Sequence, residues 1–349
     1  MNRLLEVVDS GFGNCIQDGG RTGYRSIGVP VAGAADGQLL ACANLLVGNE
    51  ADAAGIEVAL SGPSLKALSG PVRCALAGQL RARLTSVNGS TREVAPWETV
   101  TLFEGDTLAV GTSKGPGYIA LSGGVRVPPQ LGSRATYARA GLGGIDGRAL
   151  RNGDQLPCGS VSGDPWIEQR AAAYLHPEGP FRVIAGPQAD HFTPEALDRF
   201  LTQTYTVTPD MDRMGVRLEG PTLAHRPDMG ADILSDGITP GAIQVPANGQ
   251  PILLGPDCQT VGGYAKIATL ISADLPRLAH LAPGQSIRFA EVDLAQAQTA
   301  RKAQRECLAQ WRSGITTFRP PGIIDEAALY SQNLLSGIID GRDDDGDAP

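Results

Sequence analysis

Long hydrophobic runs are absent from this chain of 349 residues. No segment approaches the roughly 20 consecutive apolar residues that a helix needs to cross a bilayer. The first residues, MNRLLEVVDSGFGN, contain one arginine followed by Glu6 and Asp9, without the apolar stretch of a secretory signal. We therefore expect a cytoplasmic protein that does not act at a membrane.

Closely spaced cysteines and histidines are also missing. The six cysteines form no Cys-x-x-Cys pair, and the four histidines, His176, His191, His225 and His280, are isolated in the sequence. Structural zinc sites usually need ligands at short, regular spacing. Scattered cysteines in a chain of this size are typical of reduced thiols rather than of a disulfide framework. The sequence predicts no metal site on this chain.

A phosphate-binding loop is the third absence, because the pattern GxxxxGK[ST] occurs nowhere. Any ATP site must therefore be built differently or lie on a partner chain. The net charge is −8, to which the acidic ending DGRDDDGDAP contributes as a predicted disordered tail. Such a charge argues against nucleic acid or an anionic membrane as the main partner.

Glycine and proline are abundant, with 45 and 25 residues. This composition favours many turns between short strands. The pair Asn88-Gly89, between RARLTSV and STREV, predicts a hairpin. Apolar spacing and capping residues predict helices only around 38–47, at 193–205 and after residue 292. The predicted fold class is mainly β with a few helices.

A weak internal repeat suggests two related β units. GIEVALSGPSLKAL (55–68) resembles RMGVRLEGPTLAH (213–225), each with a glycine, an alternating strand and then Gly-Pro. We predict a first unit over 1–165, a second over 180–292, and a C-terminal helix with a disordered acidic tail over 293–349. Chance similarity between glycine-rich strands is the alternative explanation.

The first polar stretch is CIQDGGRTGYRSIGVPVAGAADG, residues 15–37. It gathers Gln17, Asp18, Arg21 and Tyr24 among glycines. An arginine can hold a carboxylate through two parallel N–H contacts, and backbone N–H groups of a glycine-rich loop can complete the site. The alternative is a structural loop in which Asp18 and Arg21 form an ion pair.

The second polar stretch is DCQTVGGYAK, residues 257–266. Its candidate site residues are Gln259, Thr260, Gly262, Gly263, Tyr264 and Lys266. If YAKIATLIS is one strand, Tyr264 and Lys266 share a face. The glycines would let the backbone approach a ligand, and a desolvated lysine can hold an anion or transfer a proton. The alternative is a barrel rim where Lys266 reaches solvent.

Both polar stretches resemble the allophanate hydrolase subunit 2 family of biotin-dependent carboxyltransferase-like proteins. The resemblance extends over roughly residues 5–292 and includes ANLLVGNEADAAGIEVALSGPSL, LSGGVRVPPQLGSRATY and GAIQVPANGQPILLGPDCQTVGGYAK. The resemblance implies two cyclophilin-like β-barrels. It also implies an enzyme component of the 5-oxoprolinase type, which joins the B subunit of that complex directly and works with the A subunit in the ATP-dependent opening of 5-oxoproline to glutamate. Two alternatives within the family are a biotin-dependent carboxyltransferase acting on a urea-like amide, and a protein that antagonises a kinase inhibitor.

The family patterns map onto both polar stretches. Gln-Asp-x-Gly-Arg-x-Gly-Tyr falls on residues 17–24, and Gln-Thr-x-Gly-Gly-Tyr-x-Lys falls on 259–266. We predict that the two stretches face one small-anion pocket, with Arg21 as carboxylate clamp and Lys266 as the cation for developing negative charge. Tyr264 and Asp18 would orient the substrate or transfer protons. The remaining predicted substrate-binding residues are Gln17, Tyr24, Gln259, Thr260, Gly262 and Gly263.

Overall fold

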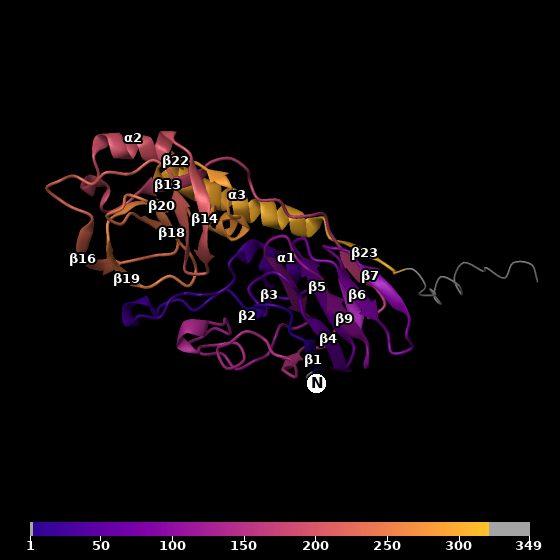
Figure 1. The fold of residues 1–349 in the computed structure, drawn as a ribbon. Coiled ribbons are helices and arrows are strands. Elements are labelled where there is room, and N and C mark those ends of the chain that lie inside the picture. Colours follow the sequence, from indigo (N-terminus) through magenta and orange to yellow (C-terminus); the bar gives the residue numbers. More distant parts are fainter. Residues whose placement is uncertain (1–2, 321–349) are drawn as a thin grey trace, which may run out of the picture.

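The computed structural model describes residues 3–320 as two β units joined by a long helix. In Figure 1 the first unit lies at the lower right and the second at the upper left. The predicted class, mainly β with two barrel-like units, is confirmed. The predicted unit boundaries stay a prediction, and the predicted acidic tail lies outside the described residues.

The first unit consists of two sheets that share one core. One has the order β11-β1-β4-β9-β6-β7 and the other β2-β3-β10-β5-β8. The six strands of the first sheet are β1 (Arg3–Asp9), β4 (Ser64–Ser69), β6 (Ala82–Thr85), β7 (Thr91–Val94), β9 (Thr107–Val110) and β11 (Gln155–Cys158). The second contains β2 (Cys15–Gln17), β3 (Gly55–Val58), β5 (Val72–Ala77), β8 (Thr99–Leu102) and β10 (Gly117–Leu121). Apolar side chains of both sheets, including Leu5, Leu65 and Leu76, are fully buried between them.

The second unit is a nearly closed barrel of eight strands, ordered β21-β14-β15-β18-β17-β20-β13-β22. Its strands are β13 (Phe181–Ala185), β14 (Tyr205–Asp212), β15 (Gly215–Glu219), β17 (Ala242–Gln244), β18 (Ile252–Leu254), β20 (Lys266–Leu270), β21 (Ser286–Ile287) and β22 (Phe289–Glu291). β21 and β22 are consecutive pieces of chain, yet they occupy opposite ends of the sheet order. The two edges of the sheet therefore meet. Strands β16 (Asp232–Gly237) and β19 (Val261–Tyr264) form a separate ribbon that projects from this barrel (Figure 1).

The three predicted helices are confirmed, and so is the predicted capping residue of the second. α1 (Gly37–Leu46) begins after Asp36, whose side chain accepts hydrogen bonds from two backbone N–H groups of the first turn. α2 (Pro194–Thr202) is capped by Thr193, with proline at its first position, as the sequence predicts. The predicted hairpin at Asn88-Gly89 joins β6 and β7. Short 3₁₀ helices are η1 (Arg25–Ile27), η2 (Ala138–Ala140), η3 (Ala189–His191) and η4 (Leu275–His280).

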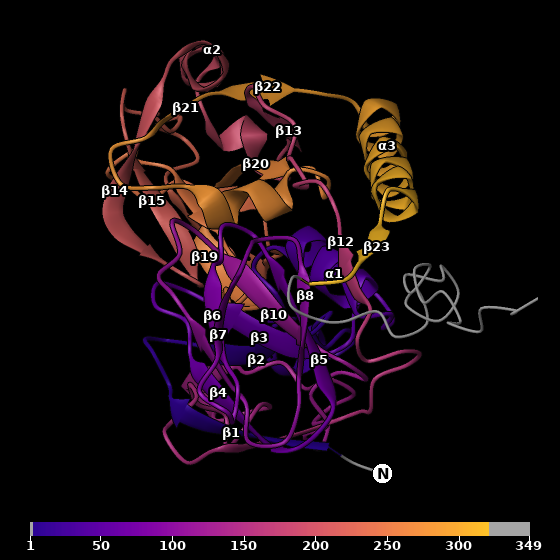
Figure 2. The same ribbon diagram turned by 90° about the vertical axis from the view of Figure 1, so that its right-hand side faces the viewer.

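The C-terminal helix α3 (Leu294–Ser313) connects the second unit back to the first. Figure 2 shows it descending from the second unit to the strand pair β12 (Glu168–Arg170) and β23 (Thr316–Phe318). Trp311 of α3 packs edge-on against Trp97 of the first unit, with ring centroids 6.0 Å apart, and donates a hydrogen bond to the carbonyl oxygen of Ala172 at 2.8 Å. Neither α3 nor any other helix within residues 3–320 has the length and apolarity of a membrane span.

Candidate functional site

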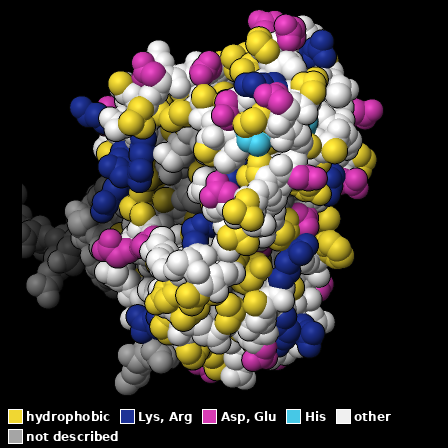
Figure 3. All heavy atoms as spheres, turned by 90° about the vertical axis from the view of Figure 1, so that its left-hand side faces the viewer, with side chains coloured by type: hydrophobic (Ala, Val, Ile, Leu, Met, Phe, Trp, Pro, Cys, Tyr) yellow, Lys and Arg dark blue, Asp and Glu magenta, His cyan; other side chains and the backbone are white. Residues whose placement is uncertain are grey.

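A cavity of about 800 Å³ lies between the two units. Its first-unit wall includes Gly19, Ala32 and Glu57, and its second-unit wall includes Arg213 and Pro256. Most of the lining is apolar, with a few charged groups, which is the usual character of a small-molecule site. Figure 3 shows a face of the molecule that is hollowed and on which acidic and basic side chains are interspersed.

Arg213 joins the two units at this cavity. Its guanidinium group donates to both carboxylate oxygens of Asp257 at 2.9 Å, to Oε1 of Glu57 at 2.5 Å and to the carbonyl oxygen of Gly33 at 2.5 Å. Burial opposes its charge, but Glu57 and Asp257 raise the pKa of Arg213 well above its ordinary value. Two carboxylates and one permanent cation therefore hold this junction.

A chain of hydrogen bonds runs from Glu57 toward α1. Tyr118 donates its O–H to Oε2 of Glu57 at 2.6 Å and accepts the backbone N–H of Asp36 at 2.8 Å. Burial, with the charge of Glu57 next, raises the pKa of Tyr118 well above its ordinary value, so the phenol remains a donor. Burial would raise the pKa of Asp36, but hydrogen bonds from His176 and His280 lower it.

In the first polar stretch, Asp18 and Arg21 are held by different partners. Asp18 accepts hydrogen bonds from the N–H groups of Gly20 and Arg134 and from the hydroxyl of Ser133. Arg21 is 1% exposed, and its Nη2 donates to the carbonyl oxygen of Ala135 at 2.5 Å. Burial lowers the pKa of Arg21 against the opposing charges of Asp18 and Asp257. Asp18 therefore shapes the loop, and the Arg21 guanidinium lies behind the protein surface.

Several polar atoms in this stretch are buried and lack a hydrogen-bond partner among residues 3–320. They are Nη1 of Arg21 and Oε1 of Gln17, and the buried terminal nitrogens of Arg25 have only the Cys258 thiol beside them. A buried polar atom without a strong hydrogen-bond partner costs free energy, so such groups are candidates for binding a ligand. Tyr24, at the loop end, is partly exposed. Arg25 was not among the predicted site residues, although it follows the family pattern directly.

In the second polar stretch, the prediction that Tyr264 and Lys266 share one strand face is wrong. Tyr264 ends β19 of the projecting ribbon and is 42% exposed, whereas Lys266 begins β20 of the barrel and is 3% exposed. The pairing of β17 with β20 also shifts register next to Gln244, where the ribbon leaves the barrel. Lys266 does not reach solvent freely, because its Nζ forms an ion pair with Oδ2 of Asp236 at 2.9 Å.

Of the other predicted residues of this stretch, Gln259 and Thr260 precede β19, and Gly262 and Gly263 lie within it. Nε2 of Gln259 lies 3.5 Å from Oε1 of Gln244, and the carbonyl oxygen of Thr260 accepts from the N–H of Ile238 at 2.9 Å. Gly262 is packed so closely that an added Cβ would overlap the side chain of Ile238. At Gly263 an added Cβ would lie 3.5 Å from its nearest neighbour, which leaves space on that side of the ribbon.

The two predicted stretches meet at the turn that follows β18. The N–H of Ala32 donates to the carbonyl oxygen of Pro256 at 3.1 Å, and Arg25 lies beside Cys258. Burial raises the pKa of the Cys258 thiol, and the charge of Arg25 opposes that shift. The start of the second stretch thus contacts the first stretch, whereas the side chain of Lys266 pairs within the second unit.

Sequence reasoning missed the charged residues that join the units. Glu57 lies in GIEV, a strand whose four residues are all buried, and a carboxylate there signals a buried partner. Its partner Arg213 is 156 residues away, so no local pattern identifies it. The histidines are isolated in sequence, but His176 and His280 both contact Asp36.

The fold and this cavity define a protein of two barrel-like β units that meet at a cleft whose lining is mainly apolar and contains a few charged side chains. Residues 27–291 match the family described as "Carboxyltransferase domain, subdomain A and B". The chain belongs to this carboxyltransferase-domain family.

Two curated relatives and one solved structure illustrate the similarity. The chain is 35% identical to the C subunit of the Escherichia coli 5-oxoprolinase, over 88% of this chain and 98% of that protein. It is 30% identical to the urea amidolyase of Saccharomyces cerevisiae, over 86% of this chain but 17% of that protein. The K. lactis urea amidolyase structure matches with a TM-score of 0.78 and 28% identity, over 88% of this chain and 20% of that chain. The chain is thus similar in extent to the first relative and to one part of the other two.

Proposed function

We propose that this chain is the C subunit of an ATP-dependent 5-oxoprolinase complex, which opens 5-oxoproline to glutamate together with the A and B subunits. The observation that carries this proposal is the 35% identity to a protein of that name, over 98% of its length. We propose that the B subunit is the direct partner, and we place the complex in the cytoplasm, where the free cysteines of this chain would stay reduced.

The chemistry explains why ATP and positive charge are needed. A five-membered lactam is a stable amide, and transfer of a phosphoryl group to its carbonyl oxygen would create a leaving group. Donors that face the developing charge lower the barrier for such a step. We place the nucleotide site on a partner chain; a site on this chain would have to be built without a phosphate-binding loop, which the sequence lacks.

We propose that the substrate lies where the first stretch meets the base of the β16–β19 ribbon. The Arg25 guanidinium, beside Cys258, would hold its carboxylate, and the unpartnered Nη1 of Arg21 would support this contact from behind the loop, because guanidinium groups bind carboxylates through paired hydrogen bonds. Lys266, oriented by Asp236, would supply the positive charge at the amide oxygen. Tyr264 would contact the substrate from the ribbon, and Asp18 would position the loop through Ser133.

The test is to mix the purified chain with the A and B subunits and measure ATP hydrolysis and glutamate formation, with and without 5-oxoproline. We expect turnover that requires all three chains and falls at least tenfold with Arg25→Met or Lys266→Met. Arg226→Met is the matched control, since Arg226 pairs with exposed Asp228 outside the cleft. A folded, assembled complex without turnover would refute the proposal.

A second candidate is a biotin-dependent carboxyltransferase that acts on a urea-like amide. The family description and the similarity to urea amidolyases favour it. Biotin would then be delivered by a carrier on another chain to the same proposed substrate site. Carboxyl transfer from carboxybiotin to urea, observed without the A and B subunits, would support this candidate over the first.

A further inference from the structure

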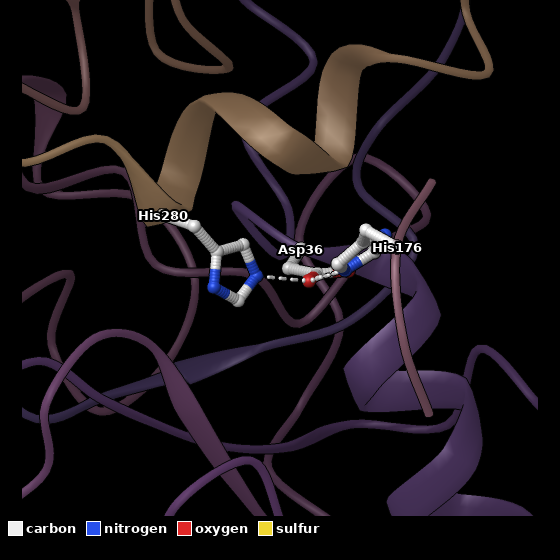
Figure 4. Close-up of side chains that lie close together, drawn as sticks. All are labelled: Asp36, His176 and His280. Atoms are coloured by element: carbon white, nitrogen blue, oxygen red, sulfur yellow. Dashed lines mark hydrogen bonds and ion pairs between the residues drawn. The ribbon is translucent and has the colours of Figure 1, made fainter. Parts of the chain in front are cut away.

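Three side chains of types that can ligate a metal ion converge beside the cleft. Nε2 of His176 and Nε2 of His280 lie 2.6 and 2.7 Å from the same oxygen, Oδ2 of Asp36. Figure 4 shows both imidazoles pointing at this carboxylate from opposite sides. Asp36 precedes α1 in the first unit, His176 lies in the segment between the units, and His280 ends η4 in the second. Three separate parts of the chain therefore meet at one oxygen.

The carboxylate of Asp36 is fully buried and lacks a permanent cation. Within the described part of the chain, its ion pairs are with the two histidines alone, and neither imidazole carries a fixed charge. A buried carboxylate is costly unless a positive charge or a metal ion compensates it. Its other oxygen is occupied, because Oδ1 accepts the N–H groups of Gln38 and Leu39 at 2.9 and 3.1 Å. Oδ2 is thus fixed in direction and turned toward the histidines.

We propose that Asp36, His176 and His280 form a binding site for a divalent transition-metal ion of the zinc type, which joins the two units at the edge of the cleft. Two imidazole nitrogens and one carboxylate are ligands that suit Zn²⁺, Co²⁺ or Fe²⁺, whereas Mg²⁺ and Ca²⁺ prefer oxygen ligands throughout. The site runs against the sequence prediction of no metal on this chain. It does not depend on the proposed function.

The ligand positions need only a small adjustment. Bond lengths of about 2.0–2.2 Å in a tetrahedral site place neighbouring ligand atoms about 3.3 Å apart. The imidazoles would therefore retreat from Oδ2 by about 0.6 Å, given the present 2.6 and 2.7 Å. The side chain of His280 is 36% exposed and has room to move. When Nε2 of His176 binds a metal, the ring proton lies on Nδ1, and no residue among 3–320 holds Nδ1 as a hydrogen-bond acceptor.

The site also has a route for an ion and a free coordination position. His176 and His280 both line a second cavity, of about 610 Å³, and His280 lines the main cleft as well. Three protein ligands with one open position are typical of catalytic zinc sites, in which water or a ligand takes the fourth place. An ion here would therefore face solvent through these cavities.

The experiment uses the full chain, treated with EDTA and dialysed, and titrated with Co²⁺ and Zn²⁺. We expect one ion per chain, Co²⁺ absorption in the visible range, and a higher melting temperature with Zn²⁺ but not with Mg²⁺. His280→Gln and His176→Gln should each weaken binding at least tenfold. Asp36→Asn should do the same while keeping the helix cap, because asparagine caps as well as aspartate.

The controls separate this site from other ligands of the chain. His191→Gln and His225→Gln should leave the affinity unchanged. Cys307→Ser tests the one exposed thiol of the described residues. Circular dichroism checks that each variant is folded, and His280→Gln, at a partly exposed position, keeps the test decisive if His176→Gln does not fold. Binding of less than one ion per chain, or binding that survives His280→Gln or is lost with Cys307→Ser, would overturn the proposal.

Discussion

Replacement of Arg213 by methionine should uncouple the two units. The variant loses four hydrogen bonds from one guanidinium group, two to Asp257, one to Glu57 and one to Gly33. Hydrogen bonds of charged groups contribute about 1.5–3 kcal/mol each, or roughly 6–12 kcal/mol for four. Release of the guanidinium from burial offsets much of this sum, and removal of one partner from a buried ion pair typically costs about 3–5 kcal/mol. We expect a loss of unfolding free energy in that range.

The size of the loss follows from burial. The side chains of Glu57 and Asp257 are 10% and 11% exposed, and methionine leaves both carboxylates without their cation. A triple variant that also carries Glu57→Gln and Asp257→Asn should recover most of the stability, because it removes the two buried charges. Arg226→Met is the matched control, since its pair with Asp228 is exposed to solvent and contributes little to stability.

Urea denaturation with two probes measures the loss. Trp97, Trp166 and Trp311 all lie in or against the first unit, where Trp97 contacts Trp311 and Trp166 stacks on Phe103. Tryptophan fluorescence therefore follows this unit, while circular dichroism follows both. We expect coincident transitions in the wild type and separate ones in Arg213→Met. A loss below about 1 kcal/mol with coincident transitions, or a triple variant no more stable than the single one, would refute the reasoning.

Three further predictions follow from individual positions, two of them with a matched control substitution. Gly143→Ala should prevent folding or cost several kcal/mol of unfolding free energy, because the added Cβ would overlap the carbonyl oxygen of Ala135 beside Arg21. Gly141→Ala is the control: it has a similar positive φ and no heavy atom within 4 Å in residues 3–320, so it should cost only about 1 kcal/mol in urea denaturation. If a ligand binds against the ribbon, Gly263→Ala should abolish turnover of the assembled complex with little change in melting temperature. Gly262→Ala should instead lower the melting temperature, because its Cβ would overlap Ile238. Unchanged turnover in Gly263→Ala would show that no ligand binds close to Gly263. Hydrogen bonds from Arg148 keep the pKa of Asp154 below its ordinary value. The stability that this carboxylate contributes is therefore full at neutral pH and is lost as the pH falls below about 4 and through the lowered pKa. The unfolding free energies of wild type and Asp154→Asn should differ at neutral pH and converge in acid, and a difference that stays constant with pH would count against this ion pair.

Local signals in the sequence predicted the secondary structure well where neighbours decide it. Thr193 and Pro194 define the start of α2, and Asn88-Gly89 defines a hairpin, because capping and turn geometry depend on adjacent residues. The break between Tyr264 and Lys266 depends instead on which strands pair with β19 and β20. Alternation along one segment carries no information about its partners, so the predicted shared face was wrong.

The site was harder to predict because its parts are distant in sequence. Asp36 is 140 residues from His176 and 244 from His280, and spacing rules for metal ligands apply only to neighbouring positions. Arg21 could be selected as a cation but not located behind the loop, because its burial depends on the segment around Ala135. Residue type thus indicated which groups carry chemistry, and tertiary structure determined which of them face a ligand.

Glu57, a charged residue within a predicted strand, was a signal in the sequence for the polar contacts between the units. A glutamate in a strand of buried residues requires a compensating partner, and Glu57 has two, Arg213 across the cleft and Tyr118 within its own sheet. Tyr118 in turn accepts the backbone N–H of Asp36, whose carboxylate holds both histidines. The charges that join the units and the histidine cluster are therefore linked by consecutive hydrogen bonds that run behind the cleft through the buried Tyr118 and Asp36. Because each link needs its neighbour to satisfy a buried polar group, the spacing of the two units is set by polar contacts as well as by apolar packing.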